Sequence, residues 1–189
     1  MSKSTFASLV IRQLDGSVGR DGSTYTSATP GQANTAIALA ITEYITTKIK
    51  LNITYLGTTI TAPPTPDTGT DSVMILGTCA PPVGIDFNSW LASIETNIMA
   101  GFLVGSGEGG IIPMTPTNAF ILPGLSTFIT QSMLRSEHEN NLEDPQRPVW
   151  EAICGGIIDW IDSSIVKTYQ STRTGISTGI STVTSVIQE

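Results

Sequence analysis

Charged side chains are scarce in this sequence, and most of those present are acidic. Only 13% of the 189 residues are Asp, Glu, Lys or Arg, which is about half the share in a typical soluble domain. The nine basic residues are scattered, and the formal net charge is -7. Because phosphate contacts need clustered Lys and Arg, this composition argues against nucleic acid as a partner. We expect such a chain either to have much of its surface covered by other proteins or to be secreted.

Cysteine, histidine and long apolar runs are also rare. Cys79 and Cys154 form no disulfide framework, so we interpret them as buried free thiols, with a disulfide as the alternative in an oxidising compartment. His138 is the only histidine and lies between Glu137 and Glu139, without further ligands at metal-binding spacing, which favours a solvated loop. No apolar run reaches the length of a membrane span, and the N-terminal run is too short for a signal peptide. We therefore expect a soluble protein that is made in the cytoplasm and has no membrane partner.

Sequence motifs that would indicate catalysis or cofactor binding are weak or incomplete. Gly105-x-Gly107-x-x-Gly110 fits the dinucleotide fingerprint as a string, but that fingerprint must follow a strand and open a helix. Here it is expected to follow a helix, so we interpret it as a loop. Asp159 and Asp162 share a helix face, and paired carboxylates can catalyse glycoside hydrolysis. The simpler interpretation is that they mark the solvent-exposed side of an otherwise buried helix. The sequence predicts no catalytic residue, metal, cofactor or small-molecule substrate, and hence no enzyme.

Apolar residues recur at helical spacing in four segments, and β-branched residues dominate several others. The predicted helices are 31–49, 86–104, 124–136 and 146–166. The predicted strands lie near 51–61 and 72–78 and in the C-terminal tail. Residues 1–14 form either a short helix or a strand. Asp86 is a cap residue for its helix. The fold class is therefore α+β, with about four helices forming a small core, a few short strands and extended arms.

The helix predicted at 146–166 contains the most informative local signal. Gly155 and Gly156 lie inside it, and each costs about 1 kcal/mol relative to alanine in a helix. A helix that accepts this usually needs close approach of another backbone, either within the chain or from a helix of the next subunit. Trp90, Trp150 and Trp160 fall on apolar helix faces, which favours core packing over a sugar-stacking platform.

Three stretches are rich in Thr, Ser, Gly or Pro and predict arms. They are the turn-rich 15–29, the proline-rich 62–71 and the low-complexity 171–189 with its tandem Gly-Ile-Ser-Thr. Residues 1–170 are predicted to form one compact domain, and 171–189 an extended C-terminal arm. Alone, such a tail should be disordered, so we expect another chain to hold it, for instance by strand addition. The interface candidates are Gly155, Gly156, Ile176, Ile180, Val183 and Val186.

This combination of a small helical core with uncharged arms at 15–29, 62–71 and 171–189 resembles virion structural proteins of tailed bacteriophages. Neck, tail, baseplate and head-decoration components share this combination of a small core and uncharged arms. The resemblance implies a non-enzymatic structural protein of the virion, made in the host cytoplasm. Its partners would be copies of itself, in rings or arrays, and other virion proteins. The alternative is a secreted or surface module for adhesion or carbohydrate binding, which a leader peptide in the gene would favour.

Overall fold

The computed structural model describes residues 3–15, 32–107, 111–116, 124–129, 147–164, 168–173 and 176–188. The helices are α1 (Lys3–Asp15), α2 (Ala33–Lys48), α3 (Phe87–Gly101) and α5 (Arg147–Ser164), and residues 125–129 add a short helical segment. The strands are β1 (Ile49–Thr59), β2 (Pro66–Ile75), β3 (Gly105–Ser106), β4 (Ile111–Pro116), β5 (Thr168–Arg173) and β6 (Ser177–Gln188). The fold is α+β, as the sequence predicts.

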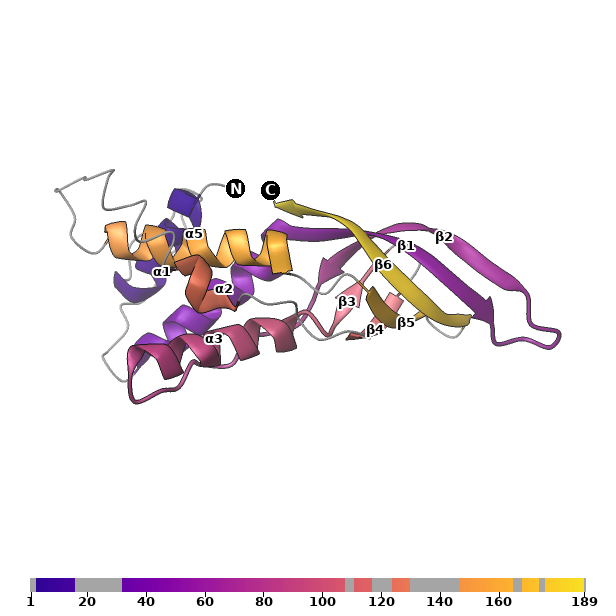
Figure 1. The fold of residues 1–189 in the computed structure, drawn as a ribbon, viewed down its shortest axis with the longest axis horizontal. Coiled ribbons are helices and arrows are strands. Elements are labelled where there is room, and N and C mark those ends of the chain that lie inside the picture. Colours follow the sequence, from indigo (N-terminus) through magenta and orange to yellow (C-terminus); the bar gives the residue numbers. More distant parts are fainter. Residues whose placement is uncertain are drawn as a thin grey trace.

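The molecule is elongated, with the helices at one end and the sheet at the other (Figure 1). Strands β1, β2 and β6 continue beyond the helices, and the turn between β1 and β2 forms the far tip. We call this three-stranded extension the β arm. Residues 62–65 lie in that turn and are exposed, as expected for the proline-rich stretch, but Pro66 and the following residues belong to β2. The stretch 62–71 is thus half turn and half strand.

Local signals explain where α3 begins and where α2 ends. Asp86 caps α3 as predicted: Ser89 N–H donates to Asp86 Oδ1 at 2.9 Å, and Asp86 N–H donates to Ser89 Oγ at 3.2 Å. This reciprocal capping box satisfies two amides that a helix start leaves without partners. Helix α2 passes directly into β1, because Ile49 already has extended backbone angles. The position of β1 is therefore set by α2, whose buried residues pack in the core.

The helices pack around aromatic and small side chains. The rings of Phe6 in α1 and Tyr44 in α2 stack with centroids 4.0 Å apart. Burial is the main cause that raises the pKa of Tyr44, and the charges of Asp162 and Cys154 on α5 add to it. Of residues 1–14, for which the sequence predicted either a helix or a strand, those from Lys3 onward lie in helix α1 and contribute to the core.

In helix α5, another backbone lies close to Gly156, as the sequence predicts. A Cβ on Gly156 would lie 2.7 Å from Cα and 2.8 Å from N of Ile129. Real Cβ atoms do not come that near to backbone, so the segment 125–129 rests directly on the helix. Gly155 and Gly156 are both buried, and this contact is within one chain. Of the two alternatives that the sequence left open, the structure shows the internal contact for Gly156, so Gly156 is not an interface residue, and Gly155 is buried beside it.

Replacing Gly156 should disturb this contact strongly. We expect Gly156→Leu to lower the free energy of unfolding by at least about 1–3 kcal/mol, the usual cost of overpacking. Leucine is the better helix former by nearly 1 kcal/mol, so any loss reflects the contact. Ser163→Leu, at an exposed position of the same helix, is the matched control and should change little. Urea denaturation measures both, and similar small effects in the two variants would contradict the close packing.

The sheet has six strands in the order β3-β2-β1-β6-β5-β4, and all neighbours are antiparallel. Side chains alternate along β1, where Ile49, Leu51, Ile53 and Tyr55 are buried. The register pairs Leu51 with Val73 of β2 and with Val186 of β6. The buried positions of neighbouring strands therefore lie on the same face of the sheet.

The C-terminal tail differs most from its expected structure. Residues 177–188 are extended, but they form β6 between β1 and β5 of the same chain. Val183 belongs to the core, with 8% of its surface exposed, and Val186 packs against it. The boundary predicted at residue 170 is thus not a boundary of the fold, because β6 completes the sheet. Strand addition from another chain is not needed to hold these residues.

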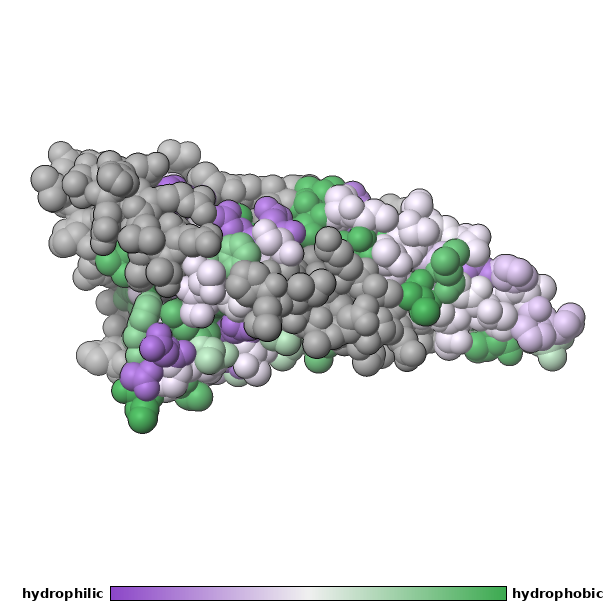
Figure 2. Space-filling view, viewed as in Figure 1, coloured by the Kyte–Doolittle hydropathy of each residue, from purple (hydrophilic) through white to green (hydrophobic). Residues whose placement is uncertain are grey.

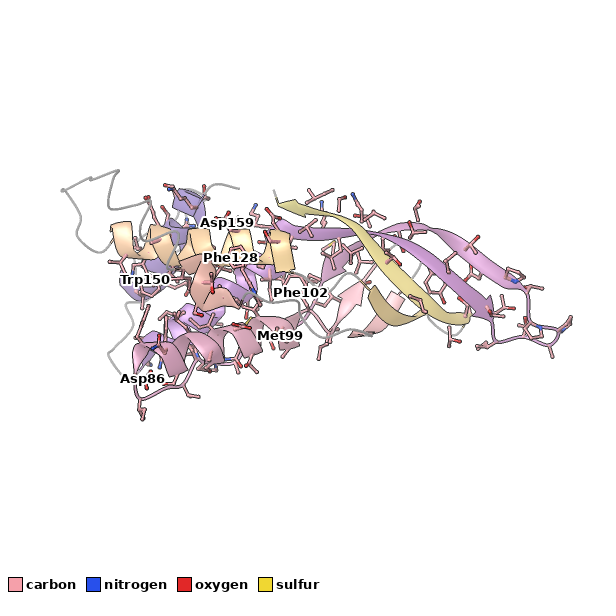
Figure 3. All side chains as sticks on the ribbon, viewed as in Figure 1. Asp86, Met99, Phe102, Phe128, Trp150 and Asp159 are labelled. Carbon is pink, nitrogen blue, oxygen red and sulfur yellow. The ribbon has the colours of Figure 1, made fainter. Side chains whose placement is uncertain are left out.

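The sheet is strongly curled. Its edge strands β3 and β4 are separated by only residues 107–110, which span at most about 18 Å, whereas the edges of a flat six-stranded sheet lie about 24 Å apart. The two edges are accordingly in contact. The concave face that results is filled by side chains of the same cluster that fills the helical end. Phe102 lies where α3 meets the sheet and joins these parts (Figure 3). One hydrophobic core therefore extends from the helical end of the molecule into the β arm.

Candidate interaction surfaces

Beyond Asn52, toward the tip, the convex face of the β arm carries no charged residue over three strands. We define this outer face as the side opposite the buried positions of β1. It comprises Thr54, Leu56 and Thr58 of β1, Pro66, Thr68 and Thr70 of β2, and Thr178, Ile180 and Thr182 of β6. Paired residues lie on the same side of a sheet, so the register places Leu56 between Thr68 and Ile180. The outer face is uncharged, rich in β-branched residues and centred on two aliphatic side chains.

Those aliphatic side chains are unusually exposed. Leu56 has 60% and Ile180 has 46% of its surface exposed, although they sit opposite each other. Ile60 and Ile176 lie nearer the tip, exposed at 62% and 57%, and Ile60 N–H donates to Ile176 O at 2.9 Å. Figure 2 shows the arm as a pale surface interrupted by green hydrophobic groups. The predicted interface residues Ile176 and Ile180 are thus on the surface, whereas Val183 and Val186 face the core.

The opposite side of the arm shows how this face is held in shape. Gly57 and Gly179 pair directly, and a Cβ on Gly179 would overlap the backbone of Leu56 and Gly57. A Cβ on Gly57 would overlap the ring of Tyr55, which is fully buried. The glycine pair therefore lets β1 and β6 approach closely and lets an aromatic ring lie along the strand. Such covering of strand glycines by an aromatic ring helps to fix strand register.

A buried polar network connects the three strands beneath the outer face. Ser177 Oγ donates a short hydrogen bond to Asp67 Oδ2, and Tyr55 Oη lies 3.0 Å from Ser177 Oγ. Because the Ser177 proton is used toward the carboxylate, the Tyr55 hydroxyl is the donor of the second bond. Ser177 has 0% of its surface exposed, so its hydroxyl is not reachable as a nucleophile. The network joins β1, β2 and β6 and serves the register of the arm.

Loss of the Ser177 hydroxyl should weaken the arm. We expect Ser177→Ala to lower the free energy of unfolding by about 1–3 kcal/mol, because Tyr55 and Asp67 lose a buried partner. Thr178→Val removes a hydroxyl from the adjacent outer-face position, which is exposed, and should change stability by less than about 0.5 kcal/mol. Thermal and urea unfolding measure both variants, and equal effects would contradict a stabilising network.

A second exposed apolar feature, which we call the α3 loop, comprises residues 80–86 before α3 and Phe87, the first residue of that helix. Val83 is 70% exposed, Phe87 49% and Ile85 102%, which means that Ile85 touches almost nothing. Figure 2 shows a green protrusion at the lower left, where Figure 1 places this loop. Asp86 is the one charged residue in the segment and is engaged as the cap of α3. The loop thus presents three apolar side chains to solvent.

Several contacts hold the α3 loop against its helix. Asn97 Nδ2 donates to Ala80 O at 2.9 Å, and Val83 N–H donates to Ser93 Oγ at 3.0 Å. A Cβ on Gly84 would come within 2.8 Å of the Ser89 carbonyl carbon, so the loop backbone lies directly on the first turn of α3.

The aromatic residues at this end add a further tie. Phe87 stacks on Trp90 with centroids 6.0 Å apart, and Trp90 Nε1 donates to Asn34 Oδ1 of α2 at 3.1 Å. Figure 3 places Asp86 at the end of α3 that points away from the sheet. The apolar side chains of the α3 loop are therefore displayed on a fixed support, which helix α2 reinforces.

Sequence patterns missed both Leu56 and the α3 loop as contact candidates. The alternation in 51–61 already places Leu56 with Thr54 and Thr58 on one face, and that signal would have identified it. Ile85 lies outside any helical or alternating pattern, between a glycine and a cap residue. Its exposure depends on how the loop folds back on α3, which local sequence does not encode.

The residues weighed for chemistry do not converge. Gly105 is in β3, while Gly110 and Glu137–Glu139, including His138, lie outside the described residues. Asp159 and Asp162 are on α5, where Asp162 is exposed. Among the described residues, no group of three or more His, Cys, Asp or Glu side chains is placed to hold a metal ion. Within the same ranges, no helix is both long and apolar enough to cross a membrane.

Cys79 and Cys154 are free and buried. Burial raises the pKa of Cys79 to about 11, against a smaller opposing effect from the hydroxyl of Thr42. Burial also raises the pKa of Cys154, and the charge of Glu151 adds to it. Both thiols are therefore protonated near neutral pH, and since the thiolate is the reactive form, they should be inert in the folded chain.

We expect an aromatic disulfide reagent at pH 8 to label neither thiol of the native protein quickly. Both should react at once in denaturant, because an unfolded cysteine has a pKa of about 8.5. The same difference predicts that stability falls as pH rises above about 8.5, since the unfolded state then releases thiol protons that the folded state retains. Rapid labelling of either cysteine without denaturant would contradict their burial.

Comparison with known proteins gives no family assignment. No protein-family model matches the chain, and neither a curated protein nor a solved structure is significantly similar to it. Its function is therefore inferred from the outer face and the α3 loop.

Proposed function

We propose that the chain is a non-enzymatic structural subunit of a bacteriophage virion, assembling with copies of itself and with other virion proteins. The observation that carries the proposal is the uncharged outer face of the β arm, with Leu56 and Ile180 exposed at its centre. Full burial of such side chains contributes about 1.5–3 kcal/mol each, so covering this pair would contribute on the order of 2 kcal/mol per copy. The contact surface is the outer face.

Two features of the outer face favour a contact surface. Its nine positions include no charged side chain, and two aliphatic side chains are exposed at its centre. Interface centres are depleted of charge in the same way. Since Tyr55, the aromatic residue of β1, is buried on the other side, the outer face offers no stacking platform that would favour the carbohydrate-binding alternative.

Net charge explains why the contact should be uncharged. Each chain carries a formal charge of -7, so two copies repel each other over most of their surfaces. That repulsion costs least where neither surface carries a charged side chain. An uncharged face on an acidic chain is therefore the favoured place for self-association, and the low overall share of charged residues fits a protein whose neighbours are other proteins.

The proposal that the chain belongs to a virion is supported by the composition of the sequence, with its uncharged segments rich in Thr, Ser, Gly and Pro.

A pair of matched variants tests self-association. Leu56→Lys places a charge at the centre of the outer face, whereas Leu39→Lys changes a leucine of α2 that is 55% exposed and lies outside it. Both variants have the same net charge. Light scattering coupled to size-exclusion chromatography over a concentration series should show wild type and Leu39→Lys as oligomers and Leu56→Lys as a monomer. A monomeric wild type, or equal assembly of both variants, would refute the proposal.

The virion setting has its own test. Particles of the phage whose genome encodes the chain should contain its peptides at a constant ratio to the major virion proteins, as measured by quantitative mass spectrometry. Absence of the chain from purified particles, with the chain present in the infected cell, would show that it works elsewhere.

A further inference from the structure

The α3 loop and the outer face, two of the exposed apolar features of the described residues, lie at opposite ends of the molecule. The α3 loop projects at the helical end, and the outer face extends along the arm at the other end (Figures 1 and 2). The body of the chain separates them, so they cannot cover each other within one copy. In the part of the chain that the structure describes, each copy therefore exposes one apolar protrusion and one apolar face.

We propose that the α3 loop of one copy docks on the outer face of the β arm of a second copy, so that the subunits associate head to tail. This inference rests on the proposed function, because it names the surface that occupies the outer face. Ile85 is the central side chain of the protrusion, with Val83 and Phe87 beside it. The Leu56–Ile180 pair is the centre of the receiving surface.

The support of the α3 loop favours a docking element over a flexible segment. The hydrogen bonds from Asn97 and to Ser93, together with the capping box at Asp86, fix the loop before any partner binds. A contact element that is already ordered loses little conformational entropy on binding. Stacking of Phe87 on Trp90 restricts that side chain in the same way.

Charge favours a second copy as the occupant. Asp86 is the only charged residue of the α3 loop, and its hydrogen bonds with Ser89 hold its pKa below the usual range as part of the helix cap. The outer face has no charged residue. These two surfaces therefore meet without adding to the repulsion between chains of charge -7. The pairing also uses both features of every copy, whereas a face-to-face dimer would leave Ile85 in water.

The symmetry of such a contact has consequences. Two different surfaces of the same chain form a heterologous interface, which generates a closed ring or an open filament and not an isolated dimer. Each copy would take part in two contacts and contribute roughly 1,600 Å² in all if both are of standard size.

Complementation between two variants tests the docking. Ile85→Lys disables the protrusion and leaves the outer face intact, and Leu56→Lys does the reverse. Each variant alone should lose assembly, with self-association weakened about tenfold or more, as for the central residue of an interface. Circular dichroism should show native folding in both, since the two side chains are exposed. Leu39→Lys is again the control and should assemble like wild type.

An equimolar mixture of the two variants should then form a dimer of about twice the 20.0 kDa mass of one chain, because one intact protrusion meets one intact face. Further growth is blocked, since the dimer's remaining protrusion and face both carry lysine. If Ile85→Lys assembles like wild type while Leu56→Lys does not, docking of the α3 loop is overturned and assembly through the outer face stands. A mixture that stays monomeric would also overturn the docking. A monomeric wild type, or two variants that both assemble normally, would overturn the proposed function as well.

Discussion

Pairing of β6 with both β1 and β5 is the interaction on which the rest of the structure depends. The strand order β3-β2-β1-β6-β5-β4 places β6 between two smaller groups of strands. It pairs with β1 along its whole length and with β5 from Ser177 to Thr182. Without β6, the strands attached to α2 and those that flank α5 would have no common sheet. The last strand of the chain therefore closes the fold.

The pairing of β6 with β1 also gives the β arm two sides with different properties. The concave side is occupied by Tyr55, by the Gly57–Gly179 pair and by the Ser177 network, all of which hold β1, β2 and β6 in register. The convex side takes no part in these contacts, and its Leu56 and Ile180 are exposed to solvent. A rigid strand core that displays an uncharged face is well suited to contacts between subunits. At the other end of the molecule, the α3 loop exposes a second group of apolar side chains.

Sequence signals predicted the elements better than their partners. The cap at Asp86 and the alternation after Ile49 are local, so the helix α3 and the strand β1 could be placed from them. The glycines of α5 indicated close packing, yet the contact with Ile129 depends on a distant segment. The tail was expected to be extended, but strand propensity depends on context, and nothing in its repeat identifies β1 as its partner. The exposure of Ile85 likewise results from tertiary folding.

Removal of residues 174–189 tests the central position of β6 most directly. Val183 belongs to the same core as the helices, so the account predicts that the truncated chain loses its cooperative unfolding transition and much of its helical circular dichroism. Two halves of the sheet without a connecting strand should not hold the curled core closed. A truncated chain that keeps near-native helix content and a sharp transition would contradict the account, and it would show that the tail is an arm attached to an independent domain.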